Sequence, residues 1–172
     1  DSSAGTIYTI FGDSQFLAQF DLTVLNGVNG FIIPGLPGYV LGDHVHNAGD
    51  VNGDGLEDFF VGGAKFYSGI FYLQQPTGQF ARKPLEGFVE SKTKLGEDLG
   101  SLLIDMDRDG DLDLYIARGG TEDKANAASF QDVIYKNDGK GNFTLASGAL
   151  PAFFESNSSV RSVDFDRDGD LD

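Results

Sequence analysis

Short runs of β-branched and aromatic residues alternate with segments rich in glycine, aspartate and asparagine along the whole chain. The runs are too short for helices, and their composition favours strands. From residue 45 onward they recur in one order, with two runs around an aspartate-rich segment and two more after it. This pattern predicts strands at residues 45–49, 58–62, 70–74 and 79–82, and again at 99–104, 113–117, 133–136 and 142–145.

Four antiparallel strands are expected in each recurrence. The stretch NDGKG at residues 137–141 lies between the last two strands of the second set and is a strong hairpin signal. The aspartate-rich segments begin at residues 50, 105 and 164, so their starts are 55 and 59 residues apart. A period of about this length indicates a repeat architecture, and four antiparallel strands are the unit of a propeller blade. The sequence therefore predicts an all-β fold built from such blades.

Three segments, DVNGDGLED, DMDRDGDLD and DFDRDGDLD, share one spacing of oxygen-bearing side chains. They span residues 50–58, 105–113 and 164–172. Side chains with an oxygen atom stand at positions 1, 3, 5 and 9 of each segment, and glycine stands at position 6. These side chains are Asp50, Asn52, Asp54 and Asp58 in the first segment, Asp105, Asp107, Asp109 and Asp113 in the second, and Asp164, Asp166, Asp168 and Asp172 in the third.

This spacing predicts a calcium site in each segment. Ca²⁺ takes six to eight oxygen ligands at about 2.3 to 2.6 Å, and the glycine at position 6 allows the chain to turn sharply around the ion. The backbone carbonyl at position 7 would add a ligand, from Leu56, Asp111 and Asp170 respectively. Without a cation, carboxylates that face one point would repel one another. We therefore expect about three bound calcium ions.

Two other interpretations of these segments fit less well. A solvated acidic turn is the simpler one, since aspartate and glycine favour turns. It does not explain why three segments have oxygen-bearing side chains at the same positions. An EF-hand loop closes with a bidentate glutamate at position 12, between two helices. Position 12 holds Val61 in the first segment and Ile116 in the second, and both segments lead into predicted strands.

Several stretches resemble a known family of propeller repeats. GDVNGDGLEDFFVGG resembles the FG-GAP repeat of integrin α-subunit propellers and their bacterial relatives, and IYTIFG with LNGVNGFIIPG resembles the preceding half-blade of the bacterial form. GSLLIDMDRDGDLDLYIARGG and YKNDGKGNFTLASGALP look more like the related VCBS-type repeats of secreted bacterial proteins. The similarity covers nearly the whole chain. It departs where Lys65 stands in place of a proline and where residues 123–132 form a longer insert.

The resemblance implies an incomplete β-propeller with about three blades' worth of sequence. In the first half-blade, residues 6–11 and 16–22 would form the third and fourth strands, and residues 160–163 would form the first strand of the last blade. Propellers close with at least four blades. We therefore expect either an excerpt of a longer propeller or a unit whose open β edges pair with other copies. The expected divisions are a half-blade at 1–40, blades at 41–92 and 93–155, and a partial blade at 156–172.

Composition narrows the partners and the compartment. The formal net charge of −15 argues against binding to nucleic acid, whose phosphates would be repelled. The chain has no cysteine, so a secreted β protein of this kind needs another means of stabilisation, which metal ions can provide. The sequence has no apolar run long enough to span a membrane. We expect an extracellular or cell-surface protein.

The leading functional prediction is a calcium-binding module for recognition, adhesion or assembly, with a protein or glycan partner at a cell surface or in a matrix. The alternative is a fragment of a secreted propeller enzyme that acts on polysaccharide. The chain has no cysteine nucleophile and no GxSxG motif, and its most clustered carboxylates belong to the predicted calcium sites. We therefore expect no enzymatic activity from these residues, although propellers as a fold host both binding and catalysis.

Overall fold

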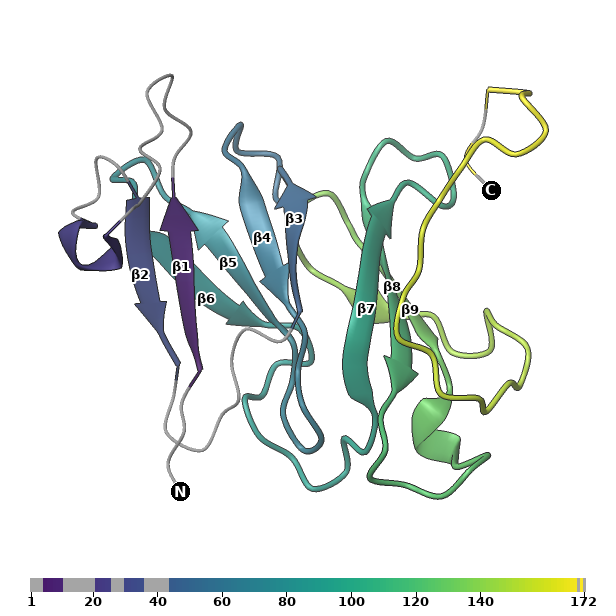
Figure 1. Ribbon diagram of the computed structural model, residues 1–172. Coiled ribbons are helices and arrows are strands. Elements are labelled where there is room, and N and C mark those ends of the chain that lie inside the picture. The colour runs from purple at the N-terminus through teal and green to yellow at the C-terminus, as the bar shows by residue number, and fades with distance from the viewer. Residues whose placement is uncertain (1–4, 11–20, 26–29, 36–43, 170, 172) are drawn as a thin grey trace. The chain divides into compact units, whose positions relative to one another are not determined.

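The computed structural model describes residues 5–10, 21–25, 30–35, 44–169 and 171. The strands of these residues form three antiparallel sheets, two of them with four strands each (Figure 1). The chain divides into two compact units, Asp1–Gly42 and Asp43–Asp172. The predicted all-β fold with blades of four antiparallel strands is confirmed.

The N-terminal unit contains a two-stranded antiparallel sheet. β1 (Thr6–Ile10) pairs with β2 (Gly30–Pro34), and Ile7 lies opposite Ile33. The Ile7 side chain is buried while its neighbours along the strand are more exposed, as expected for a strand with one covered face. The strand predicted at residues 6–11 is thus confirmed over most of its length.

Among the described residues β1 pairs only with β2, and most of the strand predicted at residues 16–22 cannot be compared with the structure. Residues 16–20 lie outside the described residues, and the end of the predicted strand begins a 3-10 helix, η1 (Leu22–Val24). The Asp21 carboxylate accepts hydrogen bonds from the Thr23 N–H at 2.9 Å and from the Thr23 hydroxyl at 2.7 Å. Such local side-chain bonds favour a turn over an extended strand.

The first four-stranded sheet has the strand order expected of a blade. Each strand pairs antiparallel with the next along the chain, and Phe60 lies opposite Phe71 at its centre. The last strand runs beyond its predicted end at residue 82 because it pairs with the whole of the preceding strand. The strands are β3 (Val45–Gly49), β4 (Asp58–Val61), β5 (Ile70–Gln74) and β6 (Phe80–Pro84).

The second four-stranded sheet repeats this order. Its last strand is shorter than predicted, because Asn142 folds into the preceding turn. The Asn142 backbone N–H and side-chain amide both donate to the Asp138 carboxylate, at 3.1 and 2.9 Å. The strands are β7 (Glu97–Ile104), β8 (Asp113–Gly119), β9 (Val133–Lys136) and β10 (Thr144–Leu145). A second 3-10 helix, η2 (Ala128–Phe130), lies in the insert before β9.

Residues 160–163 do not form the predicted strand. A first blade strand exists only through its pairing with a second strand, and no described residue pairs with this segment. The chain just before it crosses the second sheet in an extended form, and the Asn157 N–H donates to the Arg118 carbonyl at 2.9 Å (Figure 1). Glycine at position 119 permits this approach, because a Cβ atom there would lie 2.3 Å from the Asn157 carbonyl oxygen.

The hydrophobic core of the C-terminal unit is built by side chains from both four-stranded sheets. Phe71 of β5 stacks on Phe143, with ring centroids 4.4 Å apart and planes 9° from parallel. Phe60 of β4 packs against the same Phe71 ring at 4.8 Å. The two sheets therefore share one core, whose buried members are Ala48, Val51, Phe60, Phe71, Leu85, Leu114, Ile116 and Tyr135.

Candidate metal-binding loops

The first aspartate loop connects β3 to β4 and folds its polar side chains inward. The Asp50 carboxylate accepts hydrogen bonds from the backbone N–H groups of Asp54 and Gly55, at 3.0 and 2.7 Å. The Asn52 carboxamide oxygen also accepts from the Asp54 N–H, at 3.0 Å. Gly53 and Gly55 have left-handed backbone angles, with φ of 73° and 85°. These two residues reverse the chain direction, so positions 1, 3 and 5 are directed toward one centre.

The second loop, between β7 and β8, repeats this hydrogen bonding at the same positions. The Asp105 carboxylate accepts from the N–H groups of Asp109 and Gly110, at 3.2 and 3.0 Å. Position 4 is again left-handed, although it holds Arg108 with φ of 62°. A non-glycine residue in that region costs roughly 1 kcal/mol or more. The second loop nevertheless adopts the same conformation without a glycine at position 4.

The third loop follows the same scheme in its described part. The Asp164 carboxylate accepts from the Gly169 N–H at 3.2 Å, and the Asp166 carboxylate accepts from the Asp168 N–H at 3.2 Å. The Asp164 Oδ1 atom is buried and has no hydrogen-bond partner among the described residues. A buried carboxylate oxygen without a donor is energetically costly, and a cation in the loop would satisfy it.

The carboxylates at positions 1, 3 and 5 lie close enough to share one ion. In the second and third loops, each of the three carboxylates offers an oxygen within 4.8 Å of the other two. Ligands on opposite sides of a calcium ion are about 5 Å apart, since each lies at about 2.3 to 2.6 Å. The residues present therefore fit a hard divalent cation, and they are Asp105, Asp107 and Asp109 in one loop and Asp164, Asp166 and Asp168 in the other.

Position 9 is buried and bonded to the backbone. Asp58 and Asp113 are 2% and 1% exposed. Asp58 accepts from the N–H groups of Val51 at 3.3 Å and Gln74 at 2.8 Å. Burial raises the pKa of Asp58, and these two hydrogen bonds partly offset the effect. The residue at position 9 thus ties its loop to the third strand of the same sheet, and its role as a direct ligand remains a prediction.

Asp113 repeats this arrangement in the second blade. It accepts from the N–H groups of Met106 at 3.3 Å and Asn137 at 2.9 Å, which are the positions equivalent to those around Asp58. The position 7 carbonyls of Leu56 and Asp111 remain predicted ligands. Asp170 and Asp172, the remaining predicted ligands of the third loop, lie outside the described residues.

Charges around the second loop are partly compensated by Lys136. Its Nζ atom lies 2.7 Å from Asp107 Oδ2, and this hydrogen bond lowers the pKa of Asp107. Asp111 is in the opposite situation: partial burial, followed by the charges of Asp109, Asp105 and other carboxylates, raises its pKa. A bound cation would relieve this repulsion.

The first loop also contacts the second blade. The Asn137 side-chain amide donates to the Val51 carbonyl at 2.9 Å, and Val51 itself is part of the shared core. A Cβ atom on Gly53 would lie 3.2 Å from the Gly139 carbonyl oxygen, so the loop and the β9–β10 turn approach closely. The conformation of the loop therefore contributes to the contact between the two blades.

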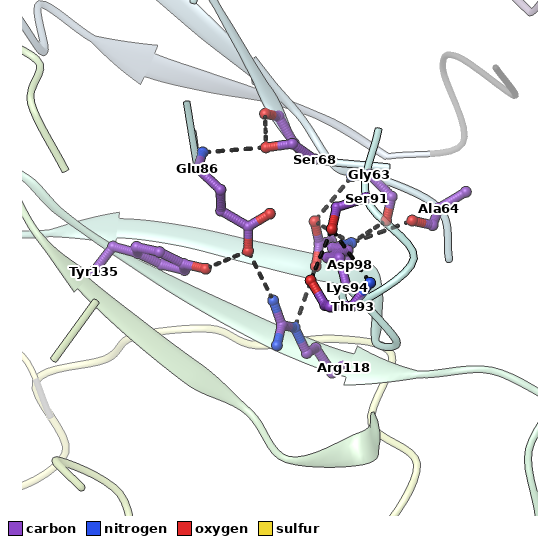
Figure 2. A network of polar contacts seen from close by, with 11 residues as sticks. Gly63, Ala64, Ser68, Glu86, Ser91, Thr93, Lys94, Asp98, Arg118 and Tyr135 are labelled. Atoms are coloured by element: carbon purple, nitrogen blue, oxygen red, sulfur yellow. Dashed lines mark hydrogen bonds and ion pairs between the residues drawn. The ribbon is translucent and has the colours of Figure 1, made fainter. Parts of the chain in front are cut away.

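A second group of polar residues between the blades was not predicted from the sequence (Figure 2). Lys94 and Asp98 form a buried ion pair at 3.0 Å, with side chains 3% and 1% exposed. The Arg118 Nε atom lies 3.4 Å from Asp98 Oδ1, and its Nη2 atom lies 3.7 Å from Glu86 Oε1. Tyr135 donates to Glu86 Oε1 at 2.7 Å. Apart from Lys94 and Asp98, which are four residues apart, these residues are far from one another along the chain.

The chain was compared with known proteins. A family model described as an FG-GAP-like repeat matches residues 50–116 and residues 105–172, so each match begins at the first aspartate of a loop. The comparison with curated proteins gave no match. Among the described residues, no helix has the length and apolar character needed to cross a bilayer.

Proposed function

Because the chain belongs to the family of FG-GAP-like repeat proteins, we propose that it is a calcium-stabilised, propeller-type module for recognition or adhesion outside the cell. The observation that carries this proposal is that the carboxylate at position 1 accepts from the glycine N–H at position 6 in all three aspartate loops. In the second and third loops three carboxylates also lie within 4.8 Å of one another, which is unfavourable unless a cation neutralises them.

Calcium suits these loops better than magnesium does. The donors at positions 1, 3 and 5 are carboxylate or carboxamide oxygens, and a backbone carbonyl is expected at position 7. Ca²⁺ accepts a flexible set of six to eight such oxygens, whereas Mg²⁺ requires near-ideal octahedral geometry and keeps several water molecules. When bound, the ion supplies positive charge that neutralises the clustered carboxylates.

Residues of the loops would connect a stabilised loop conformation to the rest of the fold. Asp50 holds the turn, Asp58 fixes the loop to β5, and the Val51 carbonyl accepts from Asn137 of the next blade. A loop held in this conformation keeps the two blades in contact. The absence of cysteine fits this role, since ions can replace disulfides in stabilising an extracellular β protein.

We also propose a class of partner and a mode of assembly. A protein or glycan at a cell surface or in a matrix is the partner that we propose. The β6 and β10 edges have no further strand in their sheets among the described residues, and open edges pair with strands from other chains. We expect light scattering after size-exclusion chromatography to show a mass that grows with concentration. A constant mass of 18.4 kDa would contradict self-assembly.

Terbium luminescence tests the metal site. The chain has six tyrosines and no tryptophan, so energy transfer from tyrosine should excite Tb³⁺ bound in the loops. We expect Ca²⁺ to displace Tb³⁺ at much lower concentration than Mg²⁺ does. Asp54→Ala should reduce the signal, whereas Asp123→Ala, outside the loops, should not. Equal displacement by both ions, or no signal, would refute the calcium assignment.

A further inference from the structure

The first aspartate loop differs from the other two at positions 3 and 4. It holds Asn52 and Gly53 there, whereas both other loops hold an aspartate followed by an arginine. All three position 4 residues share a left-handed backbone, with φ of 73° at Gly53, 62° at Arg108 and 64° at Arg167. The loops therefore have the same backbone at this point and differ in chemistry. An asparagine followed by glycine loses its side-chain amide readily, because glycine has no Cβ atom to hinder its backbone nitrogen.

Hydrogen bonds fold the Asn52 side chain back along the chain, toward the peptide that follows it. Its Oδ1 atom accepts from the Asp54 N–H at 3.0 Å, a bond to the second residue on that defines an Asx-turn. Its Nδ2 atom donates to the Asp54 Oδ2 atom at 3.1 Å. Gly53 is exposed, and its N–H has no acceptor among the described residues. The Gly53 nitrogen is thus not engaged by a competing bond.

These contacts suit attack of the Gly53 nitrogen on the Asn52 Cγ atom. The attack forms a C–N bond and moves negative charge onto Oδ1, where the Asp54 N–H, which also reaches Asp50, can stabilise it. The bond from Cγ to Nδ2 then breaks, and the proton lost by the Gly53 nitrogen is returned to Nδ2, which leaves as ammonia. The product is a cyclic imide. Water opens it at either carbonyl, to aspartate or to isoaspartate, without any oxidant or reductant.

We propose that Asn52 is a modification site whose deamidation is controlled by calcium in the first loop. The Asn52 oxygen and the Asp54 carboxylate are the predicted ligands at positions 3 and 5. A bound ion would engage both groups, so the side chain could no longer close on the Gly53 nitrogen. This inference rests on the proposed calcium site and adds a covalent consequence of leaving that site without its ion.

The two products would change the loop in different ways. Conversion of Asn52 to aspartate gives the first loop the carboxylate that the other loops carry at position 3, and a higher ligand charge favours calcium. Isoaspartate carries the backbone through the side-chain carbon, which lengthens the chain between positions 3 and 5. There is little room for this change, because a Cβ atom on Gly53 would lie 3.2 Å from the Gly139 carbonyl oxygen of the next blade.

Peptide mapping by tandem mass spectrometry tests the inference on the 172-residue chain. The protein is incubated at mildly alkaline pH, either in excess EDTA or in calcium at about ten times the dissociation constant measured by calorimetry. Asn52 should deamidate about tenfold more slowly in calcium, because only about a tenth of the loops is then free of the ion. Chymotryptic digestion separates Asn52 from the other two Asn–Gly pairs, at residues 26–27 and 29–30 of the N-terminal unit. Those pairs lie outside the loops, so their rates should not depend on calcium.

Two variants locate the protection in the first loop. Asp50→Ala removes the ligand at position 1 and keeps the Asn52–Gly53 pair, so calcium should no longer slow its deamidation. Asp123→Ala, which removes one carboxylate outside the loops, should keep the protection of the wild type. Asp50 also accepts hydrogen bonds within the turn, so circular dichroism must show that the variant is folded. The comparison of wild-type protein in EDTA and in calcium decides the question without it.

The outcomes separate this inference from the proposed function. No deamidation at Asn52 in EDTA, or equal rates in EDTA and in calcium, would overturn the inference. If calorimetry shows calcium binding in the same sample, the proposed function is left intact by either result. Failure of calorimetry to detect calcium binding would refute the proposed calcium site and this inference with it.

Discussion

Asp98→Asn removes the charge of a buried carboxylate that joins the two blades and keeps its shape. The carboxylate lies on β7 and is reached by the Lys94 ammonium at 3.0 Å, the Gly63 N–H at 2.9 Å and the Arg118 Nε atom at 3.4 Å. After the substitution, the acceptors left to Lys94 are all neutral: the carbonyls of Gly63 and Ala64 and the carboxamide oxygen of the new asparagine. The ammonium is then buried without a counterion.

The expected cost follows from this burial. Removing one partner of a buried ion pair destabilises a protein by roughly 3 to 5 kcal/mol. For a unit of this size, 1 kcal/mol corresponds to about 3 to 5 °C in melting temperature. We therefore expect Asp98→Asn to lower the melting temperature by roughly 10 to 25 °C. Replacing both partners, as Lys94→Met with Asp98→Leu, should restore much of the loss, because no uncompensated charge then remains.

Asp123→Asn is the matched control. Asp123 forms the same kind of pair with Lys65, at 2.7 Å, but water reaches both side chains. Solvent screens such pairs, so the control should melt close to the wild-type temperature. Both variants are compared by thermal and urea unfolding followed by circular dichroism in calcium. A loss in Asp98→Asn no larger than that in Asp123→Asn would refute the reasoning that this pair stabilises the contact between blades.

Three further predictions concern metal, core and pH. Excess EDTA should lower the melting temperature in differential scanning calorimetry, because each site at ten times its dissociation constant contributes about 1.4 kcal/mol; an unchanged curve would contradict calcium stabilisation. Phe71→Ala should lower the free energy of unfolding, measured in urea, by about 3 to 5 kcal/mol, because it removes the ring that packs on Phe143 and leaves a cavity. Phe165→Ala, at a residue 83% exposed, should change this free energy by less than about 0.5 kcal/mol. Burial lowers the pKa of Lys94 below 10.5, so between that lowered value and 10.5 the unfolded chain binds more protons. Urea unfolding should therefore show stability rising with pH more steeply in the wild type than in Lys94→Met, and equal slopes would exclude this contribution.

The strands that sequence predicted best are those whose apolar residues meet the shared core. β5 (Ile70–Gln74) and β9 (Val133–Lys136) have the predicted bounds, and their Phe71 and Tyr135 side chains lie in this core. Strand ends that depend on side-chain hydrogen bonds were harder to predict. Asn142 donates two hydrogen bonds to Asp138, which places it in a turn and shortens β10. The strand predicted at residues 160–163 was wrong, because an apolar pattern does not provide the neighbour with which a strand must pair.

The aspartate loops were predictable because their chemistry is local. A ligand at every second position and a glycine at position 6 suffice to place the carboxylates of positions 1, 3 and 5 around one centre. The group of polar residues around Glu86 was not predictable in this way. Glu86, Arg118 and Tyr135 are brought together only when two sheets pack, and nothing in their spacing along the chain records that contact.

Calcium titration of metal-free protein by isothermal calorimetry tests the central claim most directly. We predict saturable binding of three ions per chain, one for each aspartate loop, and two ions per chain for the Asp109→Ala variant. The Asp123→Ala variant, with the same loss of one carboxylate outside the loops, should still bind three. A stoichiometry of zero or one for the wild type would contradict the account.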